Sequence, residues 1–108
     1  MAEIVEAKVI AEFTNYNELI DALNRRKADL GLSCLLMDEL GGLPHGYTAK
    51  VLGPGRVKGL GAISTDAING VLGVKFAVIE DLEAVKRMEH RWERRNESHV
   101  RQRARNLP

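Results

Sequence analysis

The sequence predicts a small α+β protein that is mainly helical, with a core of four helices, a small two-stranded sheet and a C-terminal helix. Apolar residues recur every three or four positions in several segments that begin at Ser, Asn or Asp and end at Gly. Two further segments, 3–13 and 74–80, are rich in β-branched residues. With 108 residues, 44% of them hydrophobic and 29% charged, the chain is long enough to bury one core.

The first predicted helix spans Tyr16 to Leu30. Asn15 precedes it as the expected N-cap, and Glu18 follows three residues later, which is the spacing of a capping box. Gly31 is expected to end it, because glycine readily adopts the left-handed conformation that follows many helices. Helical spacing predicts an inward face made of Leu19, Ile20, Ala22 and Leu23.

The segments Glu3–Phe13 and Val74–Glu80 are the predicted strands. β-branched residues dominate the apolar set of the first, and the second alternates apolar with polar residues. We expect the two to pair with each other, because a lone strand would leave its backbone N–H and C=O groups without partners.

Residues 31–52 read GLSCLLMDELGGLPHGYTAKVL and predict two short helices joined by a tight turn. Ser33 is the expected N-cap of the first helix, and the glycine pair that follows Leu40 is its expected end. The second helix is predicted to span Pro44–Leu52, because proline has a helical φ and needs no N–H at a first position. Together they form a helix-turn-helix motif. The side chains expected to face inward are Leu36, Met37, Leu40, Tyr47, Thr48 and Val51.

This motif resembles the helix-turn-helix of XRE or lambda-repressor-like regulators, whose pattern is close to GLSQEELAELAGLSxxYIxxxE. The resemblance is close over Gly31–Leu52 and has no gap. It departs at Cys34, where the family usually has a phosphate-contacting Gln, at Asp38, where a small residue is usual, and at Thr48, where Ile or Val is usual. The residues that coincide are Gly31, Leu32, Ser33, Glu39, Leu40, Gly42, Leu43 and Tyr47.

The resemblance implies a repressor-like core and a transcriptional regulator that binds double-stranded DNA. In this fold the second helix of the motif lies in the major groove. Carried over by position, His45 and Lys50 would face base edges, and Ser33 would meet a phosphate. Arg56 and Lys58, in the loop that follows, would hold the DNA backbone.

An alternative class stays open on the same sequence. Gly46 and Ala49 fall on the expected base-reading face and offer no side-chain hydrogen bonds, and the net charge is only +1. The motif would then be a scaffold that does not bind DNA, in an interaction module of the adaptor or antitoxin-like kind.

Asp38 needs partners of its own, because a carboxylate at a helix–helix contact is costly unless it is hydrogen-bonded. We expect it to be a structural clasp rather than a catalytic acid. The free N–H groups near Leu43 to Gly46, or the Tyr47 hydroxyl, are its expected donors.

The rest of the chain predicts a helix capped by Ser64 and ending at Gly73, and then a last helix capped by Asp81. An apolar stripe on that last helix predicts a homodimer. Residues 1–98 are predicted to form one domain, and 99–108 a basic flexible tail. Residues 86–108 hold eight Lys or Arg against three Asp or Glu. A third interpretation is therefore nonspecific nucleic-acid binding, mainly by Arg94, Arg95, Arg101, Arg103 and Arg105. The stripe contains Leu82, Val85, Met88 and Trp92.

Several classes of function are not expected. Cys34 and His45 lack a third orienting residue for nucleophilic catalysis, so no enzyme is predicted. The histidines have no metal-like spacing with Cys34, which predicts no metal and no cofactor. The lack of a long apolar run and of a signal-like N-terminus, together with the single cysteine, predicts a cytoplasmic protein that does not bind membranes.

Overall fold

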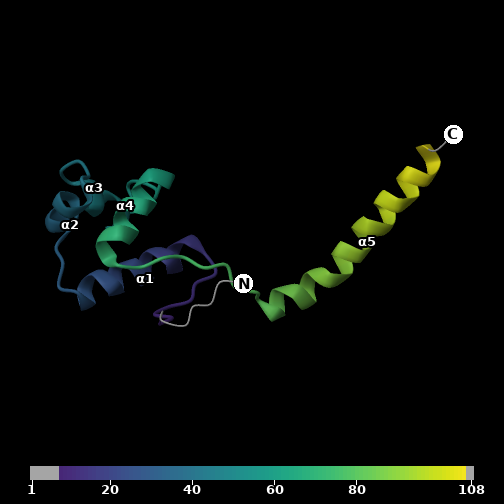
Figure 1. Ribbon diagram of the computed structural model, residues 1–108, viewed down its shortest axis with the longest axis horizontal. Helices are drawn as coiled ribbons and strands as arrows, with labels where there is room; N and C mark the ends of the chain where they lie inside the picture. The colour runs from purple at the N-terminus through teal and green to yellow at the C-terminus, as the bar shows by residue number, and fades with distance from the viewer. Residues whose placement is uncertain (1–7, 107–108) are drawn as a thin grey trace. The chain divides into compact units, whose positions relative to one another are not determined.

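The computed structural model describes residues 8–106, with side chains for 8–94. This part of the chain contains five α-helices and no strand (Figure 1). The chain divides into two compact units, one ending at Lys75 and the other starting at Phe76, so that four helices belong to the first unit and one to the second. The helices are α1 (Tyr16–Asp29), α2 (Cys34–Gly41), α3 (Tyr47–Leu52), α4 (Ala62–Leu72) and α5 (Leu82–Asn106).

Helix α1 begins at Tyr16 as predicted and ends at Asp29, one residue before the predicted Leu30. The Asn15 side chain accepts a hydrogen bond from the Glu18 amide at 2.9 Å. The Glu18 carboxylate in turn accepts from the amide and the hydroxyl of Thr14, which lowers the pKa of Glu18. Gly31, at φ +67°, follows the end of the helix. This variant of the capping box satisfies donors that the first turn would otherwise leave free.

The ends of α2 confirm their predicted signals, but the start of α3 does not. Ser33 caps α2 by accepting from the Leu36 amide at 3.1 Å, and Gly42 ends it at φ +64°. Helix α3 begins at Tyr47, so the prediction of a helix from Pro44 is wrong. The reason is Gly46, whose φ of +85° cannot continue a helix. Pro44 instead opens a turn, which the Tyr47 amide closes by donating to its carbonyl.

Helix α4 also begins at a different residue from the one predicted. Ser64 was expected as its N-cap, but the helix starts at Ala62 and Gly61 precedes it. Ser64 sits in the first turn, and its hydroxyl oxygen accepts from the Gly61 amide at 2.9 Å. Gly73, at φ +64°, ends the helix as predicted.

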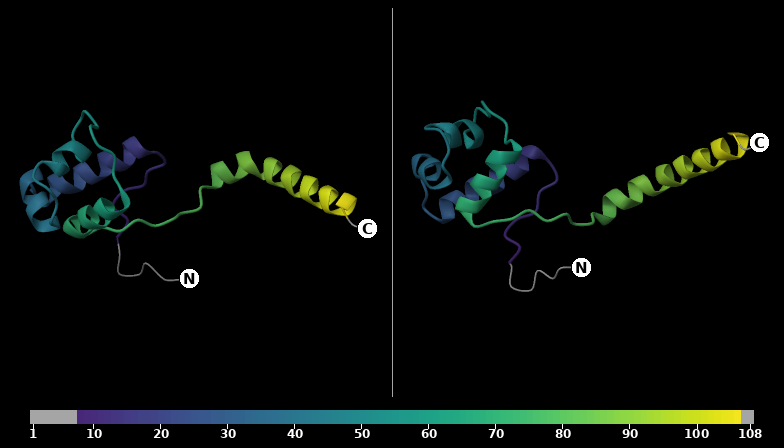
Figure 2. Two further views of the ribbon diagram at one scale, coloured as in Figure 1. Left: turned by 90° about the horizontal axis from the view of Figure 1, so that it is seen from above. Right: turned by 45° about the horizontal axis from the view of Figure 1, so that its top comes forward.

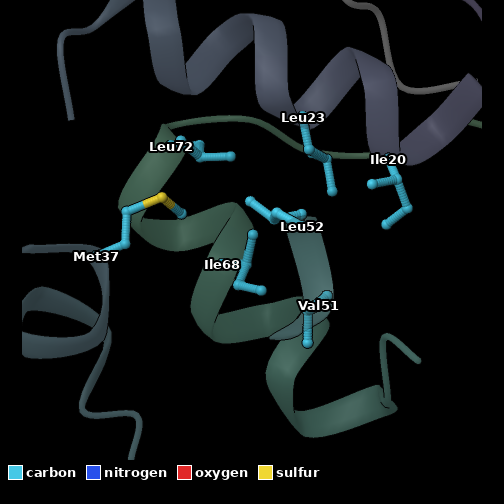
Figure 3. Close-up of a cluster of buried hydrophobic side chains, with 7 residues drawn as sticks. All are labelled: Ile20, Leu23, Met37, Val51, Leu52, Ile68 and Leu72. Atoms are coloured by element: carbon cyan, nitrogen blue, oxygen red, sulfur yellow. The ribbon is translucent and has the colours of Figure 1, made fainter. Parts of the chain in front are cut away.

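The core of the first unit is a cluster of seven buried side chains that point toward one another from all four helices (Figure 3). Helix α2 contributes only Met37 to it. Leu36 and Leu40, which were predicted to face inward, are exposed. The inner face of α2 is instead set by Met37, Asp38 and the close approach of Gly41 to Val71. The cluster contains Ile20, Leu23, Met37, Val51, Leu52, Ile68 and Leu72.

Side chains of α1 cap the C-terminal ends of two other helices. The Asn24 side-chain amide donates to the Leu52 carbonyl at 2.8 Å, at the end of α3. The Arg26 guanidinium donates to the Leu72 carbonyl at 2.9 Å, at the end of α4. Carbonyls at helix ends have no partner within their own helix, so α1 supplies the donors that both helix ends would otherwise lack.

The predicted two-stranded sheet is not present in the part of the chain that the structure describes. Val74–Glu80 has no secondary structure, and neither has the segment from Lys8 to Phe13, while residues 3–7 of the first predicted strand lie outside the described residues. An alternating pattern favours a strand when one of its faces becomes buried. Here Val78 and Ile79, on opposite faces of the alternation, are both exposed. The fold described is therefore all-helical.

Helix α5 forms the second unit and is drawn from two directions in Figure 2. Asp81 caps it as predicted, accepting from the amides of Glu83 and Ala84. Its backbone continues to Asn106, past residue 98, where the sequence predicted the domain to end. The domain boundary and the flexibility of the tail stay predictions. Within residues 8–106, no helix combines the length and apolar character that crossing a membrane requires.

The inner face of α2 leads to the first prediction. Met37→Ala should lower the free energy of unfolding of the first unit by about 2–5 kcal/mol, because it leaves a cavity under a side chain that is 0% exposed. Leu40→Ala is the matched control, and it should cost less than about 1 kcal/mol because Leu40 is 61% exposed. Urea denaturation followed by far-ultraviolet circular dichroism measures both. Equal losses would contradict the packing of α2 described here.

Candidate nucleic-acid interface

The two helices of the motif are joined by the carboxylate of Asp38. One oxygen accepts from the Thr48 hydroxyl at 2.6 Å and from the Thr48 amide at 2.9 Å. The other accepts from the Gly46 amide at 2.8 Å. Asp38 is 3% exposed and Thr48 is 0% exposed, so these bonds form away from water. Asp38 thus acts from α2 as the cap of α3, whose own preceding residue, Gly46, has no side chain.

The ionised form of Asp38 is favoured by this arrangement. Burial raises the pKa of its carboxyl group, as it does for any carboxylate removed from water. The hydrogen bonds from Thr48 and Gly46, with a smaller contribution from the charge of His45, more than offset burial and hold the pKa below its usual value. Asp38 is therefore a structural anion rather than a proton donor.

Asp38 and Thr48, two of the departures from the repressor-like pattern, are thus hydrogen-bonded to each other. The predicted clasp is confirmed, and the Gly46 amide lies in the range expected for its donors. Thr48, which supplies two of the three bonds, was predicted only as an inward residue. The sequence did contain a signal for this contact, because an acid and a hydroxyl replace a small and an apolar residue at two positions of the same motif.

The outer surface of α3 is small. Thr48, Val51 and Leu52 are buried, which leaves Ala49 and Lys50 as its exposed residues. His45 is exposed in the turn before the helix. Of the residues predicted to face base edges, both His45 and Lys50 are therefore open to solvent.

Lys58 lies next to this surface, although it is eight positions further along the chain than Lys50. Its amide donates to the Lys50 carbonyl at 3.1 Å, and its ammonium group lies 5.0 Å from the centre of the Tyr47 ring. Tyr47 is half-buried, and it was expected as an inward residue or as a donor to Asp38, whose donors are instead Gly46 and Thr48. The sequence did not predict this contact, because the path of the loop between Gly53 and Lys58 decides it.

The Arg56 side chain forms hydrogen bonds and an ion pair within the first unit. Its guanidinium donates to the carbonyls of Leu52 and Gly53, each at 3.2 Å, and forms an ion pair with Asp21 of α1 at 2.9 Å. Its backbone has φ +48°, the one positive value for a residue other than glycine in the described chain. Arg56 therefore fastens the loop to the middle of α1 and to the end of α3.

The first turn of α2 contains the remaining predicted residue, Ser33. Its oxygen accepts from the Leu36 amide as the cap, and the side chain is exposed. Cys34, at the first helical position, is a free thiol that is partly exposed. The hydroxyl of Ser33 keeps its own proton to donate.

Acids are missing from the sequence of α3 and of the loop that follows it. Between Glu39 and Asp66 the chain contains Lys50, Arg56 and Lys58 and no Asp or Glu. Asp38, the acid nearest to α3 across the turn, is turned inward and covered. The second half of the motif and the loop after it thus carry positive charge only.

The described residues hold no group of three His, Cys, Asp or Glu side chains that could bind a metal ion.

Comparisons of the chain with protein-family models, curated proteins and solved structures found no match in any of the three. The resemblance to repressor-like regulators stays a prediction.

The clasp leads to the second prediction. Asp38→Ala should lower the free energy of unfolding by about 3 kcal/mol at neutral pH, because three buried donors lose a charged acceptor. The folded-state pKa of Asp38 is depressed, so its contribution is complete above its ordinary pKa of about 4 and is lost as the pH falls through the lower folded value. The difference between wild type and variant should therefore shrink below about pH 4.

Denaturation with urea at a series of pH values measures this difference. Glu39→Ala is the control, since Glu39 is the exposed acid next in sequence and should cost less than about 0.5 kcal/mol. Hydrogen exchange of the Gly46 and Thr48 amides gives a local readout, and both should lose protection in Asp38→Ala. A stability difference that is independent of pH down to full protonation would refute the assignment.

Proposed function

We propose that the protein binds double-stranded DNA through α2 and α3 and acts as a cytoplasmic transcriptional regulator of the repressor-like kind. In this proposal the predicted segment Pro44–Leu52 enters the major groove, with His45 and Lys50 toward base edges. Ser33 and Lys58 contact the backbone. Arg56 has the role of holding the loop in shape, with its remaining N–H groups directed to phosphate.

One observation carries the proposal: the exposed surface of α3 and its loop has lysines and no acid, while Asp38 is buried beneath it. Phosphate contacts from such cations supply much of the affinity of DNA-binding proteins. A carboxylate free on this surface would repel the backbone, but Asp38 accepts from Thr48 and Gly46, and the exposed Asp21 is paired with Arg56.

A titration of a fluorescent duplex with the full-length chain at two salt concentrations tests the proposal. Lys50→Ala should weaken binding about tenfold, because a contact to a base edge is lost. Lys75→Ala is the matched control, an exposed lysine outside the motif, and it should change the affinity by less than about twofold because salt screens distant charges.

The possible outcomes distinguish the three functional interpretations. Binding that weakens with salt and depends on Lys50 supports the proposal. Binding that is unchanged in Lys50→Ala, but is lost when Arg101, Arg103 and Arg105 are changed to Ala, would show that the basic end of the chain binds the DNA. Absence of binding at low salt rejects DNA and leaves the interaction module.

A second candidate function has its own observation. Helix α2 exposes three leucines to solvent, with Leu35 53% exposed, Leu36 38% and Leu40 61%. Exposed apolar residues that gather on one helix are typical of protein contacts. An adaptor or antitoxin-like module would use this face of α2, with the buried clasp keeping the scaffold rigid.

We also propose a homodimer through the stripe of α5, because regulators of this fold bind two half-sites with two copies. Leu82 and Trp92 of the stripe are exposed, and Val85 and Met88 are half-buried. Sedimentation should show a mass of twice 12.0 kDa that falls to 12.0 kDa in Trp92→Ala. Arg87→Ala, on the opposite face of the helix, is the control and should stay dimeric. Wild type that is monomeric at every concentration would remove the dimer.

A further inference from the structure

We propose that Tyr47 is a positioning residue that holds Lys58 beside α3, so that the Lys58 ammonium group binds a phosphate of a nucleic-acid backbone while Lys50 faces a base edge. The inference rests on the proposed function and adds to it a residue and a ligand class. It assigns Lys58 to a contact that is independent of base sequence.

The backbone fixes where Lys58 begins. The last carbonyls of a helix lack partners within it, and the Lys50 carbonyl obtains one from the Lys58 amide at 3.1 Å. Arg56, bonded to the Leu52 and Gly53 carbonyls, holds the loop just before this point. The main chain of Lys58 is thereby attached to α3.

The Tyr47 ring then fixes where the Lys58 side chain ends. Its ammonium group lies 5.0 Å from the ring centre, within the range of a cation–π contact. Tyr47 and Lys50 are three positions apart on α3 and so are neighbours on its surface. A lysine held in this way loses less conformational freedom on binding a ligand than a free one, which favours affinity.

The charges around the pair indicate an anion. The ion pair that the structure describes in the first unit joins Arg56 to Asp21, so neither Lys50 nor Lys58 is neutralised by it. Lysine binds phosphate as a point charge, without the fork that lets arginine read a base edge. Backbone contacts of this kind orient a protein on DNA without reading its sequence.

The test compares Tyr47→Phe with Tyr47→Leu in the full-length chain, using short duplexes of unrelated sequence. Tyr47→Phe keeps the ring and should bind like wild type. Tyr47→Leu should lose about two- to fivefold in affinity on every duplex, because the freed Lys58 side chain must then be ordered on binding. Lys58→Ala should lose at least as much, and adding Tyr47→Leu to it should cause no further loss, because the two residues act as one unit.

A measurement without DNA reports the contact itself. The methylene protons next to the Lys58 ammonium should show an upfield ring-current shift in wild type and Tyr47→Phe, and not in Tyr47→Leu. Protection of the Gly46 and Thr48 amides identifies a variant that has lost the fold. Wild-type affinity in Tyr47→Leu, equal losses in both Tyr47 variants, or additive losses with Lys58→Ala would each overturn the inference. No binding of any duplex by wild type would instead reject the proposed function itself.

Discussion

The first unit depends on the carboxylate of Asp38 more than on any other polar group. Helix α3 has only six residues, and a helix of that length is not stable by itself in water. Asp38 supplies what α3 lacks, since it accepts from the amides of Gly46 and Thr48 and ties the helix to α2. Beneath it, Val51 and Leu52 pack into the core. The surface on which the functional proposals rest therefore exists because a buried anion holds its start and apolar burial holds its end.

Local signals in the sequence predicted the ends of several elements correctly. Asn15, Ser33 and Asp81 cap their helices, because each bonds an amide only two or three positions along the chain. The predicted strand at Val74–Glu80 was wrong for the opposite reason, since a strand needs a distant partner that its own pattern cannot supply. The inner face of α2 was also misjudged, because Asp38 takes a place that apolar spacing assigned to leucine.

The candidate site shows the same limit. The exposure of Lys50 and His45 followed from their place in the motif. The separation of Arg56 from Lys58 did not, because two cations two positions apart look equivalent in a loop. In the folded chain Arg56 is paired with Asp21 of α1, while Lys58 lies over the Tyr47 ring. The path of the loop, which α1 and the end of α3 determine together, decides that Arg56 is paired with an acid and that Lys58 lies over an aromatic ring.

Gly46 limits how this surface could evolve. A side chain there would meet no atom within 4 Å, so space alone would permit any residue. Its φ of +85° is strained for every residue that has a Cβ, and its amide must point at Asp38. Substitutions at the exposed Ala49 and Lys50 therefore leave the backbone unstrained, whereas a side chain at Gly46 strains it. New ligand preferences in descendants of this protein would therefore have to arise at residues such as Ala49 and Lys50, and not at Gly46.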